Sequence, residues 1–242
     1  LGVEVYGGAL LNPWFDRDLS MAGRVSYIDS QQEIKQSLID FETAVAIIPS
    51  LAIHLDREAN KDRTVNPQQH LPPIVMQVGD DDSIDFRKLL LQQIQKQSPE
   101  LDIAKVLDYE ICLYDTHNAA ITGLDGDFIS SARLDNLLSC FVGLNSLLNG
   151  DATQANLLVC SDHEEVGSVS ASGAQGSFLE SVLLRLCSDI EQHHRMLQHS
   201  MMISADNAHA VHPNYSDKHD ADHGPKINHG PVIKTNANQR YA

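Results

Sequence analysis

Basic residues and long apolar runs are scarce in this sequence, and each scarcity excludes a class of partner. Only 17 lysines and arginines stand against 33 acidic residues among 242, so the formal net charge is −16. Such a charge disfavours phosphate backbones and anionic lipid surfaces, so we expect neither nucleic acid nor a membrane as a partner. No apolar run approaches the roughly 20 residues that a membrane-spanning helix needs. The hydrophobic content of 42% is nevertheless enough for a sizeable core.

Cysteine is also scarce. The four cysteines each stand alone in an apolar pattern, at Cys112, Cys140, Cys160 and Cys187. Without a C-x-x-C pair, a thiolate zinc site is not expected. Free, buried cysteines are typical of proteins in a reducing compartment, so the composition predicts a cytoplasmic protein.

The two halves of the chain have different textures. The first half is rich in turns and predicts short strands within 1–28 and at 44–48, 74–78 and 106–114, a helix at 86–97, and a hairpin around Asp125-Gly126. From about residue 130, helix and strand alternate, with helices over 134–148 and 178–193 and strands at 157–160 and 201–205. Such alternation favours a parallel sheet, so we predict a β-rich half, an α/β half and a boundary near residue 115.

The stretch from Leu157 to Ser168 carries the strongest chemical signal. An apolar run breaks into D-H-E-E-V-G-S, which places Glu164 and Glu165 side by side. Adjacent carboxylates repel each other, and a cation relieves that repulsion. A Glu-Glu pair in a solvated loop is the commoner explanation when such a pair occurs alone.

Two further carboxylates are predicted at the ends of elements. Asp135 opens a helical pattern, where an aspartate can also act as the N-cap, and Asp206 follows the apolar run 201–205. Open α/β sheets bind their ligands at such element ends. Oxygen donors that converge there suit divalent cations, zinc included.

Several segments, in order along the chain, resemble the signatures of the M18 family of metallo-aminopeptidases. The strongest are I-S-S-A-R-L-D-N-L-L-S-C, D-H-E-E-V-G-S and I-S-A-D-N-A-H-A-V-H-P-N-Y. The segments Y-G-G-A-L-L-N-P-W-F-D-R-D-L-S-M-A-G-R-V, L-A-I-H-L-D-R and G-P-V-I-K-T-N-A-N-Q-R-Y-A are similar to that family too. The resemblance implies an α/β zinc-exopeptidase-like catalytic domain with an inserted β-rich dimerisation domain. Residues 1–7 would end a first catalytic segment, 8–115 would form the insertion and 116–242 would be part of the catalytic domain.

The resemblance also implies an activity and a site. The expected enzyme is a metal-dependent aminopeptidase that removes single N-terminal residues, preferably Asp or Glu, from peptides through water activated by two metal ions. Zinc is the expected metal, and cobalt or manganese would suit the same donors. Asp135 would bridge both ions, Glu165 and Asp206 would each bind one, and Glu164 would be the general base.

Two basic residues occupy positions that the family places at or near its active site. Lys234 would neutralise the acidic side chain of the substrate, although a solvated strand lysine explains it equally well. His54 would reach the substrate from the dimerisation domain of a neighbouring subunit. The resemblance predicts a homo-oligomer built from dimers, commonly a dodecamer.

Other interpretations stay open at this point. A broader-specificity exopeptidase or deacylase would use the same metal residues, whereas a catalytically dead scaffold would have no need for them. His209 and His212 are three residues apart, as a helical metal pair would be, but we interpret them as packing residues or as residues that contact the metal ligands rather than the metal. The family takes two histidine ligands from segments that this sequence does not match, so we predict an excerpt of a longer protein that alone binds zinc poorly.

Overall fold

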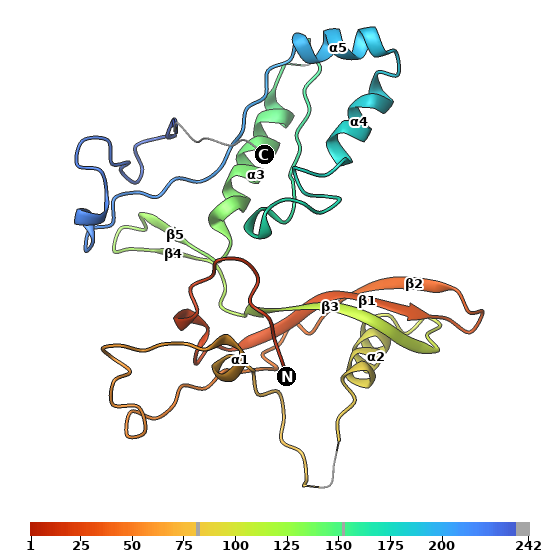
Figure 1. The fold of residues 1–242 in the computed structure, drawn as a ribbon, viewed down its shortest axis with the longest axis vertical. Coiled ribbons are helices and arrows are strands. Elements are labelled where there is room, and N and C mark those ends of the chain that lie inside the picture. Colours follow the sequence, from red (N-terminus) through yellow and green to blue (C-terminus); the bar gives the residue numbers. More distant parts are fainter. Residues whose placement is uncertain (81–82, 152, 236–242) are drawn as a thin grey trace. The chain divides into compact units, whose positions relative to one another are not determined.

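The computed structural model describes residues 1–80, 83–151 and 153–235. Its chain divides into two compact units, Leu1–Ala132 and Arg133–Ala242, which Figure 1 shows as a ribbon. The last seven residues of the segment G-P-V-I-K-T-N-A-N-Q-R-Y-A lie outside the described residues.

The first unit is built on a three-stranded antiparallel sheet. Its strands are β1 (Leu19–Ile28), β2 (Ile34–Asp40) and β3 (Lys105–Asp115), in the order β2-β1-β3. Asp29 holds the turn between β1 and β2, because its carboxylate accepts the backbone N–H groups of Gln31 and Glu33, both at 2.9 Å, and Lys35 Nζ at 2.6 Å. A carboxylate with three donors satisfies a turn whose backbone groups would otherwise be unpaired.

The helix predicted at 86–97 is confirmed as α2 (Phe86–Gln97). It covers one face of this sheet (Figure 1). Asp85 caps it by accepting the Arg87 N–H at 3.0 Å. Leu90 and Ile94, one turn apart, are fully buried. They form a core cluster with Val25, Ile39 and Val106 from the three strands. Packing of an apolar helix stripe on the sheet therefore stabilises this part of the unit.

A second apolar cluster joins the start of β1 to the segments around it. Leu19, Ala46, Ile48 and Leu71 are buried in it, and Trp14 packs against them. The 3-10 helix η1 (Asn12–Trp14) carries Trp14, and the short helix α1 (Pro67–His70) ends directly before Leu71. The predicted strands at 44–48 and 74–78 are wrong as strands. Only isolated bridges form there, Leu19 to Ala46 and Ile47 to Ile74. Prolines border both segments, Pro49 after the first and Pro72-Pro73 before the second, and limit how far the pairing extends.

The predicted hairpin around Asp125-Gly126 is confirmed. Strands β4 (Ala120–Thr122) and β5 (Phe128–Ser130) pair antiparallel across it. Gly123 and Gly126 both have positive φ, at 97° and 71°, which a glycine adopts without steric cost.

The second unit is helical and irregular over its described residues. It contains α3 (Leu134–Asn149), η2 (Glu164–Val166), α4 (Phe178–Leu186), α5 (Ile190–Gln198) and η3 (Ser216–Lys218). The single helix predicted over 178–193 is wrong, since it is two helices. Asp189 starts the second one by accepting the Gln192 N–H at 2.9 Å.

The predicted strands at 157–160 and 201–205 are also corrected. No strand occurs among the described residues of this unit, so the predicted parallel sheet is absent from that part of the chain. Both segments have irregular backbone without a neighbouring strand, and Met201 and Ile203 are 84% and 78% exposed. Rather than pairing with a strand, the segment 157–160 packs on α3 through Leu158. The side chain of Leu158 lies so close to Gly143 of α3 that a Cβ added there would be 2.8 Å from Leu158 Cδ1.

The structure bears on two expectations drawn from composition. All four cysteines are free, but they are exposed or half-buried rather than buried. In the part of the chain that the structure describes, no helix combines the length and apolar character needed to cross a bilayer.

Candidate active site

Asp135 lies where α3 begins, on backbone that is not helical. Its φ and ψ are −84° and 112°, and those of Asn136 are −115° and 22°. The N-cap position belongs to Arg133, which makes no capping hydrogen bond through its side chain. The structure therefore does not give Asp135 the N-cap role that the sequence left open.

Asp206 lies in the coil that follows α5. Its carboxylate accepts the Asn207 N–H at 2.8 Å and Lys234 Nζ at 3.1 Å. Lys234 Nζ also donates to the carbonyl oxygen of Asn207 at 2.5 Å. The lysine therefore fixes the conformation of the segment that carries this carboxylate.

The side chains of Asp135 and Asp206 lie close enough together to share a hydrogen bond. The pKa of Asp135 is raised, first by partial desolvation of a residue that stays exposed, then by the Asp206 carboxylate and the charge of Glu165. At Asp206 desolvation acts in the same direction, but the hydrogen bond and charge of Lys234 outweigh it and the pKa is lowered.

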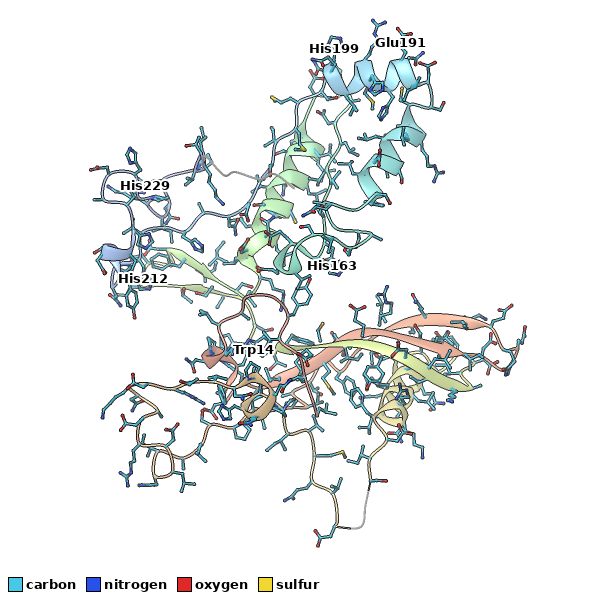
Figure 2. All side chains as sticks on the ribbon, in the orientation of Figure 1. Trp14, His163, Glu191, His199, His212 and His229 are labelled. Carbon is cyan, nitrogen blue, oxygen red and sulfur yellow. The ribbon has the colours of Figure 1, made fainter. Side chains whose placement is uncertain are left out.

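Glu164 and Glu165 form the first turn of η2, at the tip of a folded loop. His163 precedes them at φ 62° and Gly167 follows at φ 100°, so left-handed residues stand at both ends of the turn. The His163 ring is 2.6 Å from Ser170 Oγ, and the His163 carbonyl accepts the Ser168 N–H at 2.9 Å. Figure 2 labels His163 on this loop. Both glutamates are exposed, and the charge of Glu165 reaches Asp135.

Three of the predicted metal ligands therefore interact electrostatically: Asp135, Asp206 and Glu165. Lys234 joins them through Asp206, whereas the predicted base, Glu164, is adjacent to Glu165 in η2. His54 lies in an exposed turn of the first unit.

The histidines of the second unit are spread over α5 and the coil that follows it. His193 and His194 are on α5, with His199 at its end, whereas His209, His212 and His219 follow in the coil, as the labels of Figure 2 show for His199 and His212. His219 Nε2 accepts the backbone N–H of His212, and His212 packs on Tyr215 with ring centroids 4.9 Å apart. Both contacts fit the interpretation of His212 as a packing residue.

The residues present fit the acidic part of a dication site. Two carboxylates share a hydrogen bond, and a third adds negative charge, which a cation would compensate. Among the described residues, however, no group of three or more His, Cys, Asp or Glu is close enough to hold a metal ion. These side chains therefore supply part of a donor set and do not complete one.

Sequence reasoning missed the residues that hold the two aspartates together. Asn207 Nδ2 donates to the Leu134 carbonyl at 2.7 Å, and its Oδ1 accepts Ser139 Oγ at 3.2 Å. Asn136 Nδ2 lies 3.4 Å from the Ala205 carbonyl oxygen. The signal was available, since each aspartate is followed by an asparagine, at 135–136 and at 206–207.

Comparison with known proteins places these features in a family. The sequence model described as Aminopeptidase I zinc metalloprotease (M18) matches residues 1–242. A probable M18 family aminopeptidase 2 from Pseudomonas entomophila is 59% identical over 242 residues, which are 100% of this chain and 56% of the relative. A probable M18 family aminopeptidase 2 from Azotobacter vinelandii is 57% identical over 242 residues, again 100% of this chain and 56% of the relative. The chain thus spans about half the length of these curated relatives.

Solved structures are similar as well. The chain resembles one in the cryo-EM structure of the Ape4 and Nbr1 complex, with a TM-score of 0.84 and 36% identity over 99% of this chain and 50% of that one. It also resembles the S. cerevisiae mApe1 dodecamer, with a TM-score of 0.69 and 27% identity over 92% of this chain and 51% of that one.

Proposed function

Because the chain belongs to the M18 family of aminopeptidases, described as zinc metalloproteases, we propose that the whole protein removes single N-terminal residues from peptides by metal-dependent hydrolysis. The single observation that carries the proposal is the carboxylate pair Asp135 and Asp206, with the charge of Glu165 beside it. Carboxylates that lie close together repel each other; Lys234 offsets part of that repulsion, and a bound dication would offset the rest. A binding module or scaffold would have no physical need for this arrangement.

Zinc is the metal that the family description supports. Asp135, Glu165 and Asp206 would hold the metal, Asp135 as the carboxylate shared by two ions and Glu165 and Asp206 as ligands of one ion each. The ions, when bound, would lower the pKa of water and polarise the scissile carbonyl. The two further histidine ligands would come from sequence outside residues 1–242.

Glu164 would move the proton of the reaction. Its carboxylate takes a proton from the attacking water as the water oxygen bonds to the amide carbon. The protonated carboxyl then gives the proton to the amide nitrogen as the C–N bond breaks. The products are a free amino acid and a peptide shorter by one residue. The loop fixed by His163 and Ser170 supports this role, since a base must be held within reach of the proton it abstracts.

Preference for acidic N-terminal residues would depend on local cations. A protein of net charge −16 repels an acidic substrate at long range, but charges beyond a Debye length of about 8 Å are screened. Lys234 lies beside Asp206, so it is available to neutralise a substrate carboxylate near the proposed metal ligands. His54 would serve the same site from a neighbouring subunit.

The assembly and the compartment belong to the same proposal. Residues 8–115 would be a β-rich dimerisation domain inserted into an α/β catalytic domain, and 116–242 would be part of the latter. The similarity to the mApe1 dodecamer supports a homo-oligomer built from dimers. Four free cysteines support a reducing compartment, the cytoplasm.

Paired glutamine variants test the function, in a protein that carries residues 1–242 within the length of the curated relatives. Glu164→Gln keeps the shape of the side chain and removes the base, so kcat on an Asp-linked chromogenic amide should fall about 10²–10⁴-fold with the zinc content unchanged. Glu165→Gln should lower the zinc content as well.

Four results would count against the proposal. Unchanged hydrolysis in Glu164→Gln would remove the assigned base. Equal rates on acidic and neutral aminoacyl amides would favour a broader exopeptidase, and hydrolysis of acyl-amino acids alone would favour a deacylase. A wild-type protein that binds no zinc and hydrolyses nothing would be a scaffold.

A further inference from the structure

The carboxylates of Asp135 and Asp206 come from segments about 70 residues apart in the sequence, and a few side-chain contacts connect those segments. The contacts are reciprocal. Asn207, which follows Asp206, donates to the carbonyl of Leu134, which precedes Asp135. Asn136, which follows Asp135, points its amide at the carbonyl of Ala205, which precedes Asp206.

The two bridges differ in quality. The Asn207 bond is 2.7 Å long, whereas the Asn136 contact is 3.4 Å, beyond the usual range for an N–H···O bond. Asn207 also uses its second polar atom, because its Oδ1 accepts Ser139 Oγ at 3.2 Å. Its side chain therefore contacts α3 at two points, one on each side of Asp135 in the sequence.

The backbone of Asn207 extends the arrangement. Its N–H donates to the Asp206 carboxylate at 2.8 Å, and its carbonyl accepts Lys234 Nζ at 2.5 Å. One residue thus connects the start of α3, the Asp206 carboxylate and Lys234. Asn207 is partly buried, where replacing these bonds with water is less favourable than at an open surface.

We propose that Asn207 is a positioning residue of the metal site: its side-chain amide holds the Asp206 segment against the start of α3 and so keeps the two aspartate ligands in register. This inference rests on the proposed function, since it assigns a purpose to the bridge between two proposed zinc ligands. Replacing a residue that orients a metal ligand typically costs 10–100-fold in metal affinity or activity.

Asn207→Leu tests the inference in the protein at the length of the curated relatives. Leucine has a similar volume and makes neither hydrogen bond, so the zinc dissociation constant, measured by chelator competition, should rise about 10–100-fold. At saturating zinc, kcat should fall while KM changes little. Ser139→Ala removes only the weaker bond and should give a smaller rise, which keeps the test valid if Asn207→Leu does not fold.

Asn145→Ala is the matched control. Asn145 is also an asparagine whose amide donates to a carbonyl, that of Phe141 at 2.9 Å, but it lies on the exposed side of α3. The zinc affinity of the Asn145→Ala protein should equal that of the wild type. The inference is overturned if Asn207→Leu and Ser139→Ala keep wild-type zinc affinity, or if both variants lose only thermal stability in the metal-free state. A wild-type protein that binds no zinc would instead refute the proposed function.

Discussion

Replacing Lys234 with alanine tests the acidic specificity most directly. In the proposed enzyme, Lys234 would donate a charge-assisted hydrogen bond to the side-chain carboxylate of the substrate, a bond worth roughly 1.5–3 kcal/mol. The lysine already forms an ion pair with Asp206 at 3.1 Å, with side chains 45% and 63% exposed. Exposed pairs of this kind contribute about 0.2–1 kcal/mol, and the substrate would have to displace part of this contact.

The substrate hydrogen bond minus the ion pair with Asp206 leaves about 1–2 kcal/mol, which sets the expected change in kcat/KM. Lys234→Ala should lower kcat/KM for an N-terminal Asp substrate about 5–30-fold more than for a matched neutral substrate. The assay compares Asp-linked and Ala-linked chromogenic amides on the protein at the length of the curated relatives.

Lys218→Ala supplies the control for Lys234→Ala. Lys218 is an exposed lysine of the same unit, paired with Asp217 at 3.6 Å, and its loss should leave the ratio between substrates unchanged. Equal losses on acidic and neutral substrates in Lys234→Ala would refute the specificity role and leave the lysine as a partner of Asp206 alone.

Two further predictions concern the first unit, and both use denaturant unfolding of the chain. Leu90→Ala leaves a cavity at a fully buried position and should lower the free energy of unfolding by about 2–5 kcal/mol. Leu38→Ala, at a site 78% exposed, should change it by no more than about 0.5 kcal/mol. Similar losses in both variants would contradict the described core. The hydrogen bond from Lys35, followed by those from the backbone, lowers the pKa of Asp29, so its carboxylate stabilises the fold at neutral pH and loses that effect as pH falls through the lowered value. Asp29→Asn should therefore be less stable than wild type at pH 7, and the difference in unfolding free energy should narrow as the pH is lowered; a difference that widens in acid would contradict this sign.

Local patterns in the sequence predicted the elements whose causes are local. The bounds of α2 follow from its apolar spacing and from Asp85 before it, and the β4–β5 hairpin follows from Asp125-Gly126. The same reasoning failed for 157–160 and 201–205. An apolar run fits a buried strand, but a strand needs a neighbour to pair with, and pairing is not visible in a short segment.

For the candidate site, the sequence predicted the proposed ligands but not the residue that connects their segments. Family signatures identified Asp135, Glu165 and Asp206, and the structure brings the two aspartates together. Asn207 was missed because its partners, Leu134 and Ser139, lie 73 and 68 residues away in the sequence. No periodicity or local motif predicts contacts over such separations. The repeated Asp-Asn pair was a usable signal whose meaning depends on the fold.

The most direct measurement is anomalous diffraction at the zinc edge from crystals of the protein at the length of the curated relatives. Two zinc peaks should lie at the carboxylates of Asp135 and Asp206, with Asp135 contacting both and Glu165 contacting one. Zinc peaks elsewhere, or Asp135, Glu165 and Asp206 pointing apart with no cavity in common, would contradict the account.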